Sequence, residues 1–201
     1  MALPLQPGLD PWPPRLKRIA FVLLLAALVL VVGWFAPSRH GRIEAVPTTP
    51  GTEGTYERRV AETIRQAQRR VWVVMYSLWP GPEGKFTLLD ELADAVQRGV
   101  KVQVCLDLEG ERNGKTPSDG NAVAAQWLTE HGVKVVRDEP DRRTHAKIIV
   151  VDDRLVVLGS HNWTRSALRK NRELSVITDD ASVATAAAEL CRGIPGWDKD
   201  W

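Results

Sequence analysis

The sequence predicts an α/β layer fold, a mixed β-sheet flanked by helices, with an apolar helix ahead of it at the amino terminus. Three observations support this fold class. From about residue 56, segments of helical periodicity alternate with short β-branched runs, as in layered α/β domains. The chain has 201 residues, 44% of them apolar, which suffices for one domain with a proper core. An uncharged apolar run covers residues 19–36.

The helices of this domain are expected where apolar side chains recur at helical spacing. These places are residues 60–71, 87–98, 121–131 and 181–191, and a glycine directly follows the second and the third. The strands expected between them are rich in valine and isoleucine. They read VWVVMYS, KVQVCLD, VKVVR and ELSVIT.

The apolar run 19–36 has the length and the flanks of a membrane-spanning helix. As a helix it would extend about 27 Å, close to the thickness of a bilayer core. Arg15, Lys17 and Arg18 precede it, which favours a cytosolic amino terminus and a domain on the extracytoplasmic side. We therefore expect a single-pass membrane anchor. A cleaved signal peptide with a secreted or periplasmic product and a buried helix are the alternatives, although Pro37 disfavours cleavage directly after the run.

Composition also divides the rest of the chain. Arg39 and Arg42 lie beyond the apolar run and weaken the orientation signal. Proline, threonine and glycine then dominate as far as residue 55, which suits a flexible tether. The expected segments are a basic amino terminus 1–18, the anchor or signal segment 19–36, a flexible linker 37–55, a folded domain 56–192 and a tail 193–201.

Residues 144–173 carry the most informative pattern. His145 and Lys147 lie two residues apart at the head of an otherwise apolar strand. Residues two apart share a face of a strand, so both side chains project together while Ala146 and Ile148 point the other way. A strand buried on both faces has little reason to carry two such polar groups. The pattern therefore indicates a site that handles phosphate.

A hairpin is expected around the acidic pair 152–153, because apolar runs flank it on both sides. If the loop consists of those two residues, counting outward places Ser160 opposite His145, with Asn162 on the same face. One hairpin would then gather the histidine, the lysine, the serine and the asparagine. A three-residue loop or a bulge at Gly159 would shift this pairing by one position.

The arrangement resembles the signature of the phospholipase D superfamily: His-x-Lys, four residues, Asp, six residues, then Gly-Ser or Gly-Gly, any residue and Asn. The residues at its fixed positions are His145, Lys147, Asp152, Gly159, Ser160 and Asn162. Glu173 lies where single-motif nucleases of the superfamily carry the acid that orients the histidine. The resemblance extends more weakly over about 56–192 and implies a phospholipase D-like fold.

The resemblance implies a phosphodiesterase that works through a phosphohistidine intermediate. A neutral His145 imidazole would attack phosphorus, and a second, protonated imidazole would give its proton to the leaving oxygen. Lys147 and Asn162 would donate hydrogen bonds to the non-bridging oxygens, with Ser160 in the same cluster. Glu173 would fix the tautomer of the attacking histidine.

No metal or other cofactor is expected, because the acids occur as tandem pairs whose side chains diverge. Cys105 and Cys191 are too far apart in sequence for a zinc knuckle, and Cys105 is expected as a free thiol in a buried strand. We therefore expect an activity that resists chelators.

The mechanism needs two histidines, yet the sequence holds a single motif. His40, His131 and His161 lack a lysine two residues later. The simplest solution is a two-fold homodimer in which both copies of His145 face one phosphate, as the resemblance also implies. The two imidazoles would titrate as a coupled pair, so activity should peak where one proton is shared.

Several of these residues also have a structural interpretation. Asp152 lies about 16 Å along the strand from Lys147 and suits a turn or structural acid. Ser160 could bond only backbone, Asn162 could be a turn residue, and Glu173 could pair with a neighbouring arginine. His161 should point away from the cluster by strand alternation.

Three functions remain open from the sequence. The leading one is a membrane-tethered nuclease, because the compact single-motif form resembles the small endonucleases of the superfamily. The alternative is a phospholipase D acting on phospholipid head groups, which the anchor would favour; an idle phosphate-binding module is the third. Three tryptophans could stack on bases, line a lipid entrance or fill core: Trp79, Trp127 and Trp163.

Overall fold

A computed structural model of the chain divides into two units, residues 1–39 and 40–201. The residues that it describes are 13, 15–16, 18–19, 21–23, 41–79, 87–107, 119–139 and 141–200. Most of the predicted apolar segment 19–36 lies outside these residues. Within them, no helix combines the length and the apolar character needed to cross a membrane.

The second unit is built on a mixed sheet of seven strands in the order β1-β7-β6-β5-β2-β3-β4. Strands β2, β3 and β4 pair in parallel, and the remaining pairs are antiparallel. The strands are β1 (Ile43–Thr48), β2 (Arg70–Met75), β3 (Lys101–Leu106), β4 (Lys134–Arg137), β5 (Lys147–Val151), β6 (Leu155–Gly159) and β7 (Glu173–Thr178). The helices are α2 (Thr55–Arg65), α3 (Thr87–Gln97), α5 (Asp119–Glu130), α6 (Arg165–Arg169) and α7 (Ala181–Arg192).

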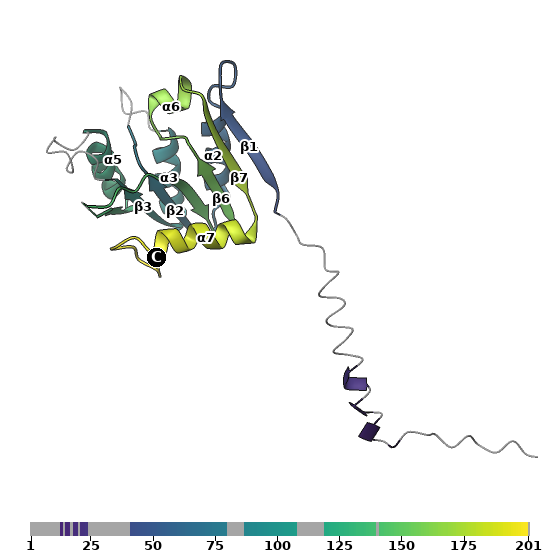
Figure 1. The fold of residues 1–201 in the computed structure, drawn as a ribbon. Helices are drawn as coiled ribbons and strands as arrows, with labels where there is room; N and C mark the ends of the chain where they lie inside the picture. The colour runs from purple at the N-terminus through teal and green to yellow at the C-terminus, as the bar shows by residue number, and fades with distance from the viewer. Residues whose placement is uncertain are drawn as a thin grey trace, which may run out of the picture. The chain divides into compact units, whose positions relative to one another are not determined.

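Helices cover both faces of the sheet, as the sequence predicts (Figure 1). One face packs against α2, α3 and α5 through buried side chains such as Ile64, Leu92 and Leu128. The other face packs against α7, whose buried residues are three alanines and a cysteine. These small side chains let α7 lie close to Trp72 and Cys105 of the sheet, because close-packed layers leave little room between them.

Strand β1 corrects the prediction of a flexible linker over 37–55. It forms the edge of the sheet and pairs with β7 from Ile43↔Thr178 to Thr48↔Glu173. The sequence hides it because only Val46 and Thr48 are buried, and because Pro47 lowers strand propensity. Proline is tolerated there because an edge strand does not need every backbone N–H.

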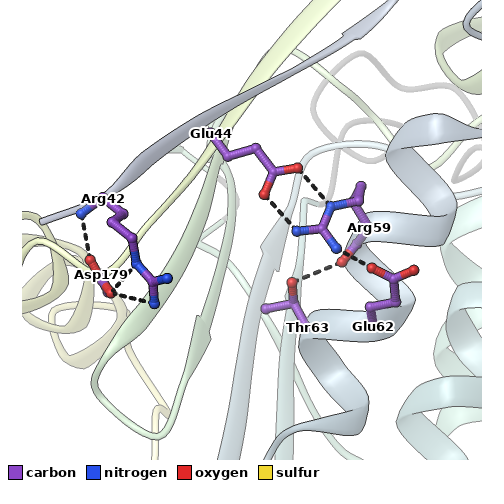
Figure 2. A network of polar contacts seen from close by, with 6 residues as sticks. All are labelled: Arg42, Glu44, Arg59, Glu62, Thr63 and Asp179. Atoms are coloured by element: carbon purple, nitrogen blue, oxygen red, sulfur yellow. Dashed lines mark hydrogen bonds and ion pairs between the residues drawn. The ribbon is translucent and has the colours of Figure 1, made fainter.

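Charged side chains hold β1 to its neighbours (Figure 2). The Arg42 backbone N–H donates to Asp179 Oδ1 at 2.6 Å, directly beyond the paired strands. Arg59 of α2 donates to Glu44 of β1, from Nε to Oε1 at 2.7 Å, and also pairs with Glu62. These pairs are partly exposed, so we expect each to contribute only about 0.2–1 kcal/mol.

The carboxyl-terminal residues pack on the sheet, where the sequence analysis expected a tail over 193–201. Trp197 is buried with its ring edge-on to Trp72, at 5.5 Å between centroids. Lys134 Nζ lies 2.6 Å from Asp198 Oδ2, and Lys101 donates to the backbone carbonyl of Asp200. The described part of this segment therefore belongs to the folded unit.

The hairpin of β5 and β6 forms as predicted, but its turn is one residue longer. Asp152 and Asp153 adopt left-handed backbone conformations, with φ of 53° and 56°, and Arg154 completes the turn. The Arg154 N–H donates to the Val151 carbonyl at 3.0 Å, and Val151 pairs with Leu155. Acidic residues tolerate the left-handed region better than most side chains do, which suits this pair to the turn.

The longer turn changes the pairing of the two strands. Ile148 pairs with Leu158, so continuing the ladder brings Ala146 opposite Ser160. The pairing of Ser160 with His145, expected for a two-residue loop, is therefore wrong, and the stated alternative of a three-residue loop with a shift of one position is the one that forms. A shift of one residue exchanges the faces of a strand, so the serine and the histidine do not share a face of this hairpin.

Asp152 ties the turn to the start of β2. Its carboxylate accepts hydrogen bonds from the backbone N–H groups of Gln68, Arg69 and Arg70 at 2.8–3.0 Å. Partial burial would raise the pKa of Asp152, but the three backbone hydrogen bonds outweigh it and lower the pKa below the ordinary 3.8. The charged form is thus the one that the fold stabilises.

Asp152→Asn is expected to destabilise the fold by about 1–3 kcal/mol at pH 7, because the amide keeps the shape but loses the charge. A lowered folded pKa gives stability that is present above the unfolded pKa and lost as pH falls through the folded pKa. The deficit should therefore shrink below about pH 4. Urea unfolding at pH 7 and pH 3 measures it, with the exposed Asp141→Asn as control. An equal deficit at both pH values would contradict this role.

Candidate active site

The polar residues of the predicted site gather at one end of the sheet, where several strands begin or end. Parallel strands β2, β3 and β4 end there, β6 ends there, and β5 and β7 begin there. Ligands of open α/β sheets bind beyond the carboxyl ends of such strands. The polar residues placed at or just beyond these strand ends are Tyr76, Asp107, Asp138, His145, Lys147, Ser160 and Glu173.

His145 and Lys147 form the centre of the site. The imidazole is exposed, whereas the lysine is only 8% exposed. Lys147 Nζ donates to the His145 carbonyl at 2.8 Å and lies 3.2 Å from His145 Nε2. An ammonium group can only donate, so this contact requires Nε2 to carry the lone pair. With the lysine charged, this geometry fits the tautomer in which the exposed Nε2 has the lone pair.

Tyr76, the first residue after β2, supports both side chains. Its ring lies 4.4 Å from the His145 ring between centroids, and Lys147 Nζ lies 4.8 Å from its centroid. An aromatic face attracts a cation, so the tyrosine helps to hold the ammonium beside the imidazole. Tyr76 was not predicted as a site residue from the sequence, although its place directly after a buried strand was a usable signal.

Two carboxylates influence the pKa of Lys147, one from a residue earlier in the sequence and one from a residue later in it. Burial lowers the pKa of Lys147, while the charges of Glu173 and Asp107 raise it. Burial is the larger effect, so the pKa lies below its ordinary value. The ammonium is therefore less costly to deprotonate than that of a surface lysine.

The backbone just before His145 is held by two buried acids. The Thr144 N–H donates to Asp107 Oδ2 at 2.8 Å and to Asp138 Oδ2 at 2.9 Å. Both acids directly follow parallel strands and are 3% and 5% exposed. These two hydrogen bonds fix the position of the backbone from which the His145 side chain projects. The sequence analysis missed them because nothing local marks two acids 31 positions apart as neighbours.

Asn121 completes this support from the start of α5. Its amide nitrogen donates to the carbonyls of Asp107 at 2.9 Å and Tyr76 at 3.1 Å, and its Oδ1 accepts from the Leu78 N–H at 2.8 Å. The segments that follow β2 and β3 are thereby joined. Such a buried, fully bonded amide makes the scaffold under His145 rigid.

Ser160 and Glu173 form a second pair at the same edge. The Ser160 hydroxyl donates to the Glu173 carboxylate and accepts from the Leu174 N–H at 3.1 Å. Asn171 donates to the other carboxylate oxygen at 2.8 Å. Within the described residues, Glu173 makes these bonds rather than the predicted one to His145. Its connection to the first pair is the electrostatic one to the lysine.

Gly159 and Asn162 complete the predicted motif. A Cβ on Gly159 would come within 2.3 Å of Ser175 Oγ and 2.4 Å of its Cα, so only glycine fits at this position, where β6 pairs with β7. Asn162 is half-buried, and its Oδ1 is buried without a hydrogen-bond partner among the described residues. Those residues also contain no group of three or more metal-binding side chains, and Cys105 and Cys191 are buried and unpaired.

Comparison with known proteins assigns this arrangement to a family. Residues 60–192 match the family described as cardiolipin synthase, PLD-like domain. The chain belongs to the phospholipase D superfamily. At the level of chemistry, it is a phosphodiester hydrolase of this superfamily.

Relatives of this superfamily member include two mitochondrial cardiolipin hydrolases. The protein of Xenopus tropicalis is 31% identical over 172 residues, which cover 86% of this chain and 74% of that protein. The human protein is 34% identical over 84 residues, which cover 42% of this chain and 31% of that protein. Among solved structures, the phospholipase D family member Nuc from Salmonella typhimurium has a TM-score of 0.65 at 23% identity, covering 80% of this chain and 98% of that one.

The other described histidines of this superfamily member, His131 and His161, do not lie beside His145. His161 is fully buried, stacked on Tyr56 at 3.9 Å, with its ring nitrogens bonded to Thr48 Oγ1 at 2.9 Å and Ser175 Oγ at 2.8 Å. Burial lowers the pKa of His161 to about 4, so it is neutral near pH 7. His131 follows α5 at the opposite edge of the sheet. His40 lies outside the described residues.

Proposed function

We propose that this protein is a metal-independent nuclease that cleaves phosphodiester bonds through a phosphohistidine intermediate. The observation that carries the proposal is the pair of His145 and Lys147, in which an exposed Nε2 keeps its lone pair beside a buried cation. Attack of Nε2 on phosphorus forms an N–P bond and breaks the P–O bond to the leaving group. Water then attacks phosphorus and releases the histidine.

In this mechanism the remaining residues manage charge and position. Lys147 moves its hydrogen bond from Nε2 to a non-bridging phosphate oxygen, which stabilises the charge that gathers there. The motif predicts that Asn162 and Ser160 contribute to the same cluster, and Glu173 acts on the lysine through its charge. Asp107 and Asp138 hold the backbone that carries the nucleophile.

The proton for the leaving group comes, we propose, from a second copy of the chain. His161 is buried with both nitrogens bonded, and His131 lies at the far edge of the sheet. Neither can serve as the second imidazole in the described part of one chain. A two-fold dimer would place a second His145 across the phosphate and share one proton between the two rings.

A nucleic acid is the preferred substrate because of the charges near His145. Arg143 is exposed on the loop directly before it, while Arg142 on the same loop pairs with Glu139 at 3.8 Å. A cationic side chain beside the nucleophile attracts a polyanion. The competing proposal is hydrolysis of phospholipid head groups, which the relationship to the mitochondrial cardiolipin hydrolases supports.

The amino-terminal segment adds a proposal on location. We propose that residues 19–36 anchor the protein in a membrane by a single pass, with the catalytic domain on the extracytoplasmic side. Cleavage of the segment as a signal would instead release a secreted or periplasmic protein. Detection of residues 1–18 in the mature protein by mass spectrometry would decide between them.

The full chain in detergent, given single-stranded DNA, duplex DNA and cardiolipin in the presence of a chelator, is expected to cleave the nucleic acids. A chelator should leave the rate unchanged, because the site works with imidazole and ammonium groups. Turnover of cardiolipin alone would replace the nuclease by the phospholipase. Activity that needs an added divalent ion would contradict the mechanism.

A further inference from the structure

A cavity of about 350 Å³ opens beside His145. One wall is the loop that leads into β5, from Asp138 to Ala146, and the other is the end of α7 with the residues after it. His145 itself lines the cavity. A phosphodiester attacked by its imidazole has two ester groups, and one of them can extend into this cavity.

The walls of this cavity combine apolar and charged groups. Leu190, Ile194 and Ala146 supply apolar surface, and Leu190 is 44% exposed although leucine prefers burial. Arg143 lies on the same lining, with its guanidinium 5.8 Å from the centroid of the Tyr76 ring that contacts His145. Arg143 therefore lies beside the pair of rings formed by Tyr76 and His145, while Glu139 and Glu189 also line the cavity.

We propose that this cavity binds one nucleoside of the substrate, with its base against Leu190 and Ile194 and its phosphate between Arg143 and His145. The proposal rests on the nuclease function proposed above and specifies where one side of the substrate lies. The volume is near the lower limit of ligand pockets, which suits a sugar with a base. Exposed Glu189 on the lining can accept a hydrogen bond from a donor at the edge of a base, such as the N3–H of thymine.

Diacylglycerol fits this cavity poorly. Its two acyl chains need more space than a cavity of about 350 Å³ provides. They would also remove water from the charged groups of Glu139, Arg142 and Glu189 on the lining. A planar base instead needs an apolar surface for its ring and polar groups at its edge. The lining supplies both.

The test compares hydrolysis of thymidine 5′-(4-nitrophenyl phosphate) and its 3′ isomer with that of methyl 4-nitrophenyl phosphate, which lacks a nucleoside. Leu190→Trp fills the cavity. We expect it to lower kcat/KM for one of the two isomers, relative to the methyl ester, by on the order of tenfold through KM. Leu190→Ala should lower the same ratio less. Val123→Trp, at an apolar residue of α5 that is exposed to a similar extent (47%), is the matched control and should leave the ratio unchanged.

Binding of thymidine 5′-monophosphate, measured by calorimetry on the same full-length variants, separates this proposal from the function. If no ester is hydrolysed but Leu190→Trp alone loses nucleotide binding, the nuclease function fails and the cavity assignment stands. An unchanged ratio with wild-type nucleotide binding in Leu190→Trp would overturn the assignment and leave the function intact. If Leu190→Trp lowers only the turnover of cardiolipin, assayed on the same variants, the assignment is also overturned, because a lipid group would then be the occupant.

Discussion

His145→Asn is expected to lower the rate of phosphodiester hydrolysis by about 10⁴-fold or more, since it removes the atom that bonds to phosphorus. Asparagine keeps a polar side chain at an exposed position, so the fold should be unaffected. Initial rates on a 4-nitrophenyl phosphodiester measure the loss, and mass spectrometry of acid-labile phosphopeptides should show that the adduct on residue 145 is gone. His131→Asn, on the opposite edge of the sheet, is the matched control. A His145→Asn protein with more than a tenth of the wild-type rate would remove the histidine from the mechanism.

The same variant tests whether the second imidazole comes from a second chain. Mixed with wild-type protein and allowed to exchange subunits, it forms dimers that carry only one His145. If both rings are needed, activity should fall as the square of the wild-type fraction. A linear fall, or a fully active monomer by analytical ultracentrifugation, would show that one chain suffices.

Lys147→Met is expected to lower kcat by about 10²–10³-fold, the usual effect of removing one donor that stabilises transition-state charge. Methionine fills the buried volume of the lysine stem, so thermal stability should change little. Lys147→Arg should not restore the rate, because a planar guanidinium cannot occupy the place of a compact ammonium between His145 and the Tyr76 ring. Full activity of either variant would contradict the role of the lysine.

The pH dependence provides a second test of this lysine. Activity that needs the charged ammonium is present below its pKa and lost as pH rises through it. Because Glu173 raises the pKa of Lys147, Glu173→Gln should move the alkaline limb of the kcat profile to lower pH. Glu130→Gln at the far end of α5 is the control. An unmoved alkaline limb would mean that another group sets it.

Much of the fold was predictable because it is written in local patterns. The helices 87–98 and 121–131 agree closely with α3 and α5, since apolar spacing and a following glycine fix both. The hairpin was also predicted, as was the pairing of His145 with Lys147, because residues two apart on one strand must share a face.

The rest depends on contacts between distant segments. Register was missed because a turn of three residues and a turn of two look alike in the letters around Asp152. Asp107 and Asp138 became neighbours of Thr144 only through the parallel pairing of β3 and β4. Strand β1 was missed because its support comes from β7, which lies more than a hundred residues away.

The bond between Thr48 and His161 couples the edge strand to the motif. A protein that begins at residue 56, where the sequence pattern suggests that the domain starts, would lose this hydrogen bond and leave one edge of β7 without a paired strand. Strand β7 would then be an exposed edge strand whose unpaired backbone N–H and C=O groups can pair with other chains. We therefore expect the smallest stably folded fragment to begin near residue 41, upstream of the matched family region, and a fragment cut at the family boundaries to lose both solubility and site geometry.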